Sequence, residues 1–195
     1  MDVEQNQPMK HAEQNRDSRF EEAAGTYGSA LERLARAYEA DPDVRRDLIQ
    51  EILIALWSSL DGFDGRCSLR TWVYRVAHNT AASHVARRMR IGSRVFVGLE
   101  EAVELADGTE GEAAVEYRDQ IDRLYALVEQ LKPLDRQVMV AYLEGMDAAS
   151  TAEITGLSAR NVATKIHRIK QVLARRFRAG GGATQGLGEG GRDER

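Results

Sequence analysis

Apolar residues recur at helical spacing along most of this chain. Between Leu48 and Leu60 they fall three or four positions apart, and the segments 19–39, 121–131 and 159–178 repeat this period. Such spacing places the apolar side chains on one face of an α-helix. Only three of the 195 residues are proline and only 6% are aromatic, which leaves room for long helices with aliphatic cores. The pattern therefore predicts an all-α fold.

Start and stop signals mark the boundaries of the predicted helices in the first half of the chain. Asp41-Pro42 is typical of a helix start, with a capping carboxylate and a proline at the first helical position. Asp61-Gly62 ends that helix. Ser68 can cap a further helix, which we expect to continue to about Arg90.

The segment 147–168 has the layout of a helix-turn-helix. Asp147 caps a short helix that ends at Gly156, a residue able to adopt the left-handed conformation, and Ser158 starts the next helix. The residues of that helix expected to be buried are Val162, Ile166, Ile169 and Leu173. Those left outside, which can reach phosphates and base edges, are Arg160, Asn161, Thr164, Lys165, His167 and Arg168. This pattern favours DNA binding; the alternative is an ordinary helical hairpin with a solvated basic face.

Composition divides the chain into two small helical domains joined by a flexible acidic linker. From Gly98 to Asp119 there are eight acidic residues and one base. The predicted divisions are a disordered tail over 1–18, a first helical domain over 19–95, the acidic linker over 96–116, a helix-turn-helix domain over 117–178 and a disordered glycine-rich tail over 179–195.

Positive charge is gathered into two blocks, although the whole chain has a formal net charge of −4. Between Gly65 and Leu99 there are seven arginines, two histidines and no acidic residue. A second stretch without acids runs from Ile154 to Gly188. Such segregation is typical of surfaces that bind a polyphosphate.

Aromatic residues lie among the arginines of the first basic block. Rings such as those of Trp72 and Tyr74 can stack on unstacked bases while arginines hold phosphates. The alternative for Trp72 is a place in the core, because it shares a helical face with Val73 and Val76.

A mixed stripe lies opposite the apolar face of the helix that starts at Asp41. Asp47, Gln50, Glu51 and Ile54 follow one another at the spacing of a single helical face. Ile54 is then an exposed aliphatic side chain in a polar row, which suggests a protein partner.

Other classes of protein find little support in the sequence. Cys67 is the only cysteine, so neither an internal disulfide nor a cysteine-cluster metal site is expected. There is no nucleophile elbow, phosphate-binding glycine loop or zinc-binding His-Glu-x-x-His motif, and we expect no catalytic residues, metal or cofactor. No apolar run approaches the length of a membrane span, so we expect a cytoplasmic protein without membrane insertion.

Two sets of motifs carry a family resemblance. The runs DLIQEILIALW (47–57), FDGR (63–66) and SLRTWVYRVAHN (68–79) closely resemble conserved region 2 of bacterial RNA polymerase sigma factors. Residues 131–173 resemble region 4, with Gly156-Leu157-Ser158 and His167-Arg168 in the expected register. The chain is most similar to the small, two-domain extracytoplasmic function (ECF) type. Both motifs occur in the expected order, with a linker of suitable length between them.

The resemblance implies a non-enzymatic factor that binds core RNA polymerase, directs it to specific promoters and promotes strand opening. The implied polymerase-binding residues are Asp47, Gln50, Glu51 and Ile54. Those implied for the melted minus-ten element, with residues 63–69 as the loop that captures a flipped base, are Phe63, Arg66, Ser68, Trp72, Tyr74, Arg75 and Asn79. Those implied for the minus-thirty-five duplex are Arg160, Asn161, Thr164, Lys165, His167 and Arg168. An anti-sigma factor is a further candidate partner.

Two other interpretations of the sequence stay open. One is a free-standing helix-turn-helix transcriptional regulator, whose first helices would serve dimerisation. The other is an interaction protein with a decayed helix-turn-helix, although the two acid-free basic blocks speak against it. Cys67-Ser68, which lies within the implied base-capture loop, leaves the preferred base undetermined.

Overall fold

The computed structural model describes residues 7–91 and 112–181, with side chains from residue 14 to 90 and from 117 to 179. These residues form α-helices and one short 3₁₀ turn, and no strand occurs among them. The all-α prediction is confirmed for this part of the chain. The predicted linker over 96–116 lies mostly outside the described residues, as does most of the tail over 179–195.

The first bundle consists of three helices. α1 (Gln7–Tyr38), α2 (Pro42–Ser59) and α3 (Leu69–Ile91) pack on one another, and the 3₁₀ turn η1 (Leu60–Gly62) follows α2. Asp41 caps α2 as predicted, with Oδ1 accepting from the backbone N–H of Asp43 at 2.9 Å. The Oγ of Ser68 accepts from the backbone N–H of Thr71 at 3.0 Å, so the predicted start of α3 is also confirmed.

The start of α1 differs from the prediction. The helix begins at Gln7, whereas the sequence predicted a disordered tail over 1–18 and a helix from Arg19. Tertiary contacts hold the end of this added segment. Arg16 forms an ion pair with Asp61, and Asp17 accepts a hydrogen bond from Trp57. Local composition gives no sign of either contact, because both partners lie forty or more positions along the chain.

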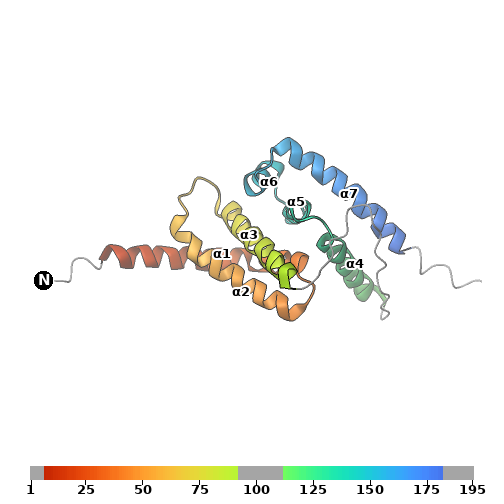
Figure 1. The fold of residues 1–195 in the computed structure, drawn as a ribbon. Coiled ribbons are helices and arrows are strands. Elements are labelled where there is room, and N and C mark those ends of the chain that lie inside the picture. Colours follow the sequence, from red (N-terminus) through yellow and green to blue (C-terminus); the bar gives the residue numbers. More distant parts are fainter. Residues whose placement is uncertain (1–6, 92–111, 182–195) are drawn as a thin grey trace, which may run out of the picture.

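The second bundle consists of α4 (Glu112–Glu129), α5 (Pro133–Leu143), α6 (Ala148–Thr155) and α7 (Ala159–Gly181). Its interior contains Leu127, Val128, Leu131, Val138, Val162 and Ile169, all buried. α5 and α6 lie under the long α7, which runs along the outer side of the bundle (Figure 1). None of the described helices is long and apolar enough to cross a membrane.

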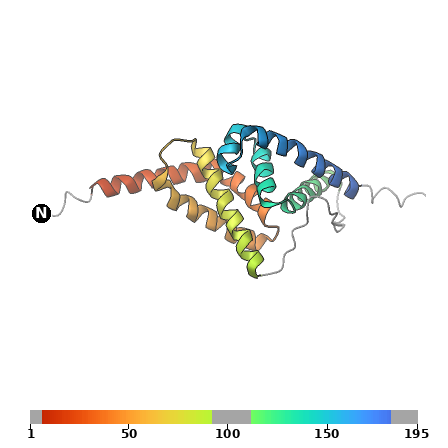
Figure 2. The ribbon, with the colours of Figure 1, turned by 45° about the horizontal axis from the view of Figure 1, so that its top comes forward.

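The two bundles pack directly against each other. α6 and the end of α5 lie at the N-terminal end of α3, and α4 lies beside the C-terminal end of α1 (Figures 1 and 2). Glu144, which follows α5, is the centre of this contact. Its carboxylate accepts from Nε and Nη2 of Arg33 at 2.7 Å each, and from the hydroxyl of Tyr74 at 3.1 Å. Arg70 of α3 donates to the backbone carbonyl of Glu144.

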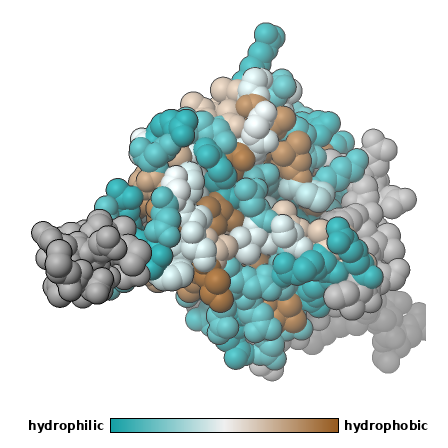
Figure 3. All heavy atoms as spheres, turned by 60° about the vertical axis from the view of Figure 1, so that its left-hand side comes forward, coloured by the Kyte–Doolittle hydropathy of each residue, from teal (hydrophilic) through white to brown (hydrophobic). Residues whose placement is uncertain are grey.

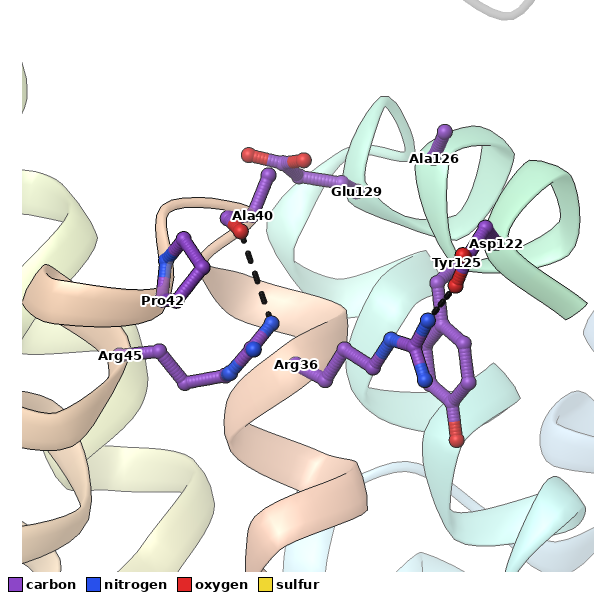
Figure 4. Close-up of a pocket in the computed structure, with 8 residues that line it drawn as sticks. All are labelled: Arg36, Ala40, Pro42, Arg45, Asp122, Tyr125, Ala126 and Glu129. Carbon is purple, nitrogen blue, oxygen red and sulfur yellow. Dashed lines mark hydrogen bonds and ion pairs between the residues drawn. The ribbon is translucent and has the colours of Figure 1, made fainter. Parts of the chain in front are cut away.

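A pocket of about 320 Å³ marks the other end of this contact. Arg36 of α1 points across it to form an ion pair with Asp122 of α4, and its guanidinium lies 4.8 Å from the centre of the Tyr125 ring (Figure 4). On the α2 side, Arg45 donates to the carbonyl of Ala40 within the first bundle at 3.5 Å. The contact between the bundles is therefore polar at both ends, with arginines of α1 on one side and carboxylates of the second bundle on the other.

Candidate nucleic-acid interface

The loop between η1 and α3 starts from a packed aromatic residue and exposes a cation. Phe63 is half-buried, and its ring lies 5.5 Å from the ring of Trp72. Gly65 adopts a φ of 77°, a left-handed conformation that favours glycine. Arg66 is exposed and donates through Nε to Asp64 at 2.5 Å. Hydrogen bonds from the backbone and side chain of Arg66 lower the pKa of the Asp64 carboxyl below its ordinary value.

One face of α3 continues this surface. Trp72, Arg75 and Asn79 follow at helical spacing, and the guanidinium of Arg75 lies 6.0 Å from the centre of the Trp72 ring. Asn79 is exposed, as is Ser68 at the start of the helix. Trp72 is half-buried and donates through Nε1 to the Oγ of Ser59 at 3.0 Å. Its indole is therefore fixed by packing, with part of it still at the surface.

Tyr74 corrects the sequence prediction for this face. It is only 1% exposed, because it lies under the second bundle and not on the surface with Trp72 and Asn79. Its hydroxyl donates to Glu144, and its ring meets that of Tyr27 edge-on at 6.5 Å. Burial, with the Glu144 carboxylate adding to it, raises the pKa of Tyr74. In this arrangement of the bundles Tyr74 is an inter-bundle contact.

The mixed stripe of α2 is exposed at three of its four predicted positions. Asp47 and Gln50 are exposed, and 66% of Ile54 is accessible. Glu51 is different, because its carboxylate lies 2.5 Å from Nη2 of Arg87 and 3.3 Å from Nδ1 of His84, both on α3. Burial opposes ionisation of Glu51, but the hydrogen bonds from Arg87 and His84 outweigh it and lower its pKa. Glu51 therefore ties α2 to α3.

A further aromatic residue of α2 lies at the surface. Trp57 fits the apolar periodicity of its helix, yet 40% of it is exposed. Helical spacing alone did not reveal this exposure, and the guanidinium of Arg16 on α1 lies 3.8 Å from the centre of the ring. Figure 3 shows one side of the molecule, on which separate apolar patches lie within a mainly hydrophilic surface.

The helix-turn-helix has the predicted geometry. Asp147 caps α6 by accepting from the backbone N–H of Ser150 at 2.7 Å, and Gly156 has a φ of 73°. Val162, Ile169 and Leu173 are buried, and Ile166 is half-buried. The predicted recognition residues that are exposed on α7 are Arg160, Asn161, Thr164, His167 and Arg168.

Lys165 is the exception among the recognition residues, because an acid of α5 holds it. Its Nζ lies 2.5 Å from Oδ1 of Asp135, and its side chain is only 25% exposed. Arg168 reaches the other oxygen of the same carboxylate at 3.4 Å while staying 59% exposed. Sequence reasoning missed Asp135, since an acid in the first turn of a helix is common and nothing local links it to a helix thirty positions away.

The described residues bring together no group of three or more histidine, cysteine or acidic side chains that could hold a metal ion. One aromatic and cationic surface lies on the first bundle, and one cationic helix lies on the second.

Each of the two bundles matches a known family. Residues 24–91 match the family Sigma-70 region 2, and residues 121–173 match Sigma-70, region 4. RNA polymerase sigma factor CnrH of Cupriavidus metallidurans is 29% identical over 164 residues, which cover 80% of this chain and 84% of that protein. The match of the first bundle is not expected if the chain is a free-standing helix-turn-helix regulator.

Two solved structures share the fold. "Structure of CnrH in complex with the cytosolic domain of CnrY" matches with a TM-score of 0.63 and 22% identity, covering 87% of this chain and 94% of that one. The sigma factor RpoE of Bartonella quintana, solved with the anti-sigma factor NepR, matches with a TM-score of 0.62 and 19% identity, covering 82% and 96% of the two chains. The chain therefore belongs to the ECF group of the sigma-70 family, the RNA polymerase sigma factors for transcription initiation.

Proposed function

We propose that this chain binds core RNA polymerase, directs it to specific promoters and promotes strand opening there. The observation that carries the proposal is the separation of two different nucleic-acid surfaces on two bundles. Loop 63–68 with α3 offers aromatic rings beside cations, which suits unpaired bases. The exposed face of α7 offers cations and amides on a helix, which suits the major groove of intact duplex.

We assign different roles to the two surfaces because of these chemical differences. Phe63, Arg66, Ser68, Trp72, Arg75 and Asn79 form the proposed minus-ten surface. Arg160, Asn161, Thr164, His167 and Arg168 form the proposed minus-thirty-five surface. Lys165, held by Asp135, is proposed to support the position of Arg168. The proposed divisions of the chain remain 1–18, 19–95, the linker over 96–116, the domain over 117–178 and the tail over 179–195. Helix α1 extends into the first of them.

The polymerase-docking surface is proposed to be the exposed part of the α2 stripe. Ile54, with Asp47 and Gln50 beside it, provides an apolar contact within a polar rim. Glu51 is proposed to support this face from beneath, since Arg87 and His84 already engage its carboxylate. An anti-sigma factor is a second proposed partner, because one of the structural neighbours was solved with such a protein.

Replacing Ile54 by Asp tests the docking surface. Co-purification with core polymerase and run-off transcription from a randomised promoter library should both fall by about tenfold or more, as expected for a central apolar contact. Helicity by circular dichroism should not change, because Ile54 is 66% exposed. The control is Ser29→Asp, which adds the same charge at an exposed position of α1. Equal losses in both variants, or none in either, would refute docking through α2.

A further inference from the structure

The first turns of α1 lie outside the matched family region. The match to Sigma-70 region 2 begins at residue 24, whereas α1 begins at Gln7. This extension runs past the end of α2, beside η1 and the start of the loop that leads to α3 (Figure 1). Its described side chains contact the end of α2, η1 and the start of the loop.

Arg16 joins the extension to the end of α2 and to η1. Its guanidinium lies 3.8 Å from the centre of the Trp57 ring, and its Nη1 lies 3.1 Å from Oδ2 of Asp61. Nε1 of Trp57 donates in turn to Asp17 at 3.2 Å. The Arg16 side chain is only 17% exposed. Arg16 is therefore a packed cation whose charge and planar face both have partners within the protein.

Arg19, one turn further along, engages the first residue of the loop. Its Nη1 donates to the carbonyl oxygen of Phe63 at 3.4 Å, and its guanidinium lies 5.6 Å from the centre of the Phe63 ring. The same ring contacts Trp72 of α3 at 5.5 Å. Phe63 is thus held from α1 and from α3 at once, and both its backbone and its ring are engaged.

These contacts fix one end of a loop whose other end is already fixed. Ser68 caps α3 and so holds the far end of the loop, while Arg66 and Gly65 between the two ends are exposed. A loop that receives an extruded base binds it more tightly if it is ordered beforehand, because binding then costs less conformational entropy. Without Arg19, the Phe63 ring would keep its contact with Trp72 and its backbone N–H would keep the bond to the Leu60 carbonyl at 3.1 Å, but the carbonyl of Phe63 would lose its donor from α1.

We propose that Arg16 and Arg19 are positioning residues, which hold η1 and Phe63 so that loop 63–68 is preorganised to receive an unpaired base. The inference rests on the proposed function, because it assumes that this loop contacts the melted strand. It adds to that function a part of the chain that lies before the matched family region.

The test uses the full chain in complex with core polymerase. The probe is a fluorescent single-stranded oligonucleotide carrying the minus-ten sequence selected by the wild-type protein from a randomised library. Arg16→Ala and Arg19→Ala should each weaken its binding about two- to tenfold, the range expected for loss of one or two such contacts. The same variants should also discriminate less strongly against oligonucleotides with a substituted base at the captured position. Binding to a duplex fragment upstream of the melted region should not change. Glu22→Ala, at an exposed position of the same helix, is the control for truncation of a surface side chain of α1.

Asp61→Asn separates positioning from a direct arginine–phosphate contact. Asp61 is an exposed acid whose partner in the structure is Arg16. Removing its negative charge would leave DNA affinity equal or higher if the arginines acted only by attracting phosphates. Positioning predicts the opposite, a weaker affinity for the single strand with an unchanged salt dependence. This variant keeps the test decisive even where Arg16→Ala lowers the yield of folded protein.

Phe63→Ala distinguishes failure of this inference from failure of the proposed function. Loss of base discrimination in Phe63→Ala, together with wild-type behaviour of the Arg16, Arg19 and Asp61 variants, would overturn the positioning role alone. Unchanged discrimination in Phe63→Ala would overturn the role of the loop and the inference with it. Weaker discrimination in all four variants supports both.

Discussion

His78 and Tyr38 form a buried polar pair inside the first bundle. The Tyr38 hydroxyl lies 3.0 Å from Nδ1 of His78, and the two rings meet edge-on at 5.8 Å. Burial lowers the pKa of His78 to about 3. Burial likewise raises the pKa of Tyr38, so the pair is neutral over the whole physiological range. α1 and α3 are joined here without a charge.

This pair predicts loss of stability on mild acidification. The pKa of an unfolded histidine is about 6.5, so below that pH the unfolded chain binds a proton that the folded chain does not. The free energy of unfolding should therefore fall as pH decreases from about 6.5 towards 3, by up to about 1.4 kcal/mol per pH unit. Urea denaturation at pH 7 and pH 5 measures the effect.

A His78→Phe variant provides the reference for that measurement. It removes the titrating group while keeping a ring at the same position, so its stability should depend less on pH between 5 and 7. The same experiment on His167→Phe, at an exposed position of α7, should leave the wild-type dependence intact. Equal pH dependence in wild type and His78→Phe would show that His78 is not the cause.

At the scale of elements, the turn between α6 and α7 depends on one glycine. Gly156 ends α6 with a φ of 73°, and its N–H bonds to the carbonyl of Ala152 at 2.9 Å. A Cβ at this position would meet no atom within 4 Å, so the cost of a side chain comes from the backbone conformation alone. Gly156→Ala should destabilise the second bundle by about 1 kcal/mol.

Thermal denaturation followed by circular dichroism checks this prediction. Gly156→Asn provides the comparison, because asparagine adopts the left-handed conformation more readily than alanine and should recover part of the stability. An alanine variant as stable as wild type would contradict the strain argument. Weaker duplex binding by the alanine variant at unchanged stability would point to a different role for this turn.

The same elements show which features the sequence could predict. Asp41, Ser68, Asp147 and Gly156 were predicted correctly, because a cap or a left-handed turn depends on a few neighbouring residues. Helical periodicity also identified the buried stripe of α7. In each case the deciding interaction spans four positions or fewer.

Tertiary packing accounts for what the sequence missed. Arg16 and Asp17, in the early part of α1, contact Asp61 and Trp57, and Lys165 is held by Asp135. Tyr74 lies in the same basic block of the sequence as its exposed neighbours, yet the second bundle covers it. Periodicity places a residue on a face of its helix, but it does not reveal which face another bundle will cover.

At the scale of the whole molecule, Glu144 holds the two bundles together. Its side chain is 8% exposed and accepts from Arg33 and Tyr74 of the first bundle. The hydrogen bonds that Arg33 donates to the Glu144 carboxylate raise the pKa of Arg33, although burial opposes this. Such a bidentate pair is stronger and more directional than an ordinary surface ion pair.

Replacing Glu144 by Ala should therefore loosen the contact between the bundles without unfolding either of them. We expect a larger radius of gyration by small-angle scattering and stronger quenching of Tyr74 by a soluble quencher. Helicity should stay the same. Glu32→Ala, at an exposed position next to Arg33, is the control. An unchanged radius of gyration would show that the carboxylate does not determine the packing of the bundles.

The position of Glu144 in the chain also has a consequence for the order of folding. The Arg33–Glu144 contact joins residues 111 positions apart, whereas the caps and turns within each bundle join near neighbours. Closing so long a loop costs more chain entropy than forming the local contacts does. Each bundle can therefore form before the two meet. By the same reasoning, we expect the contact between the bundles to open at a lower free energy than that at which either bundle unfolds. Hydrogen exchange should then show one early opening event at the ends of α3 and α5, ahead of any loss of protection in the helix interiors.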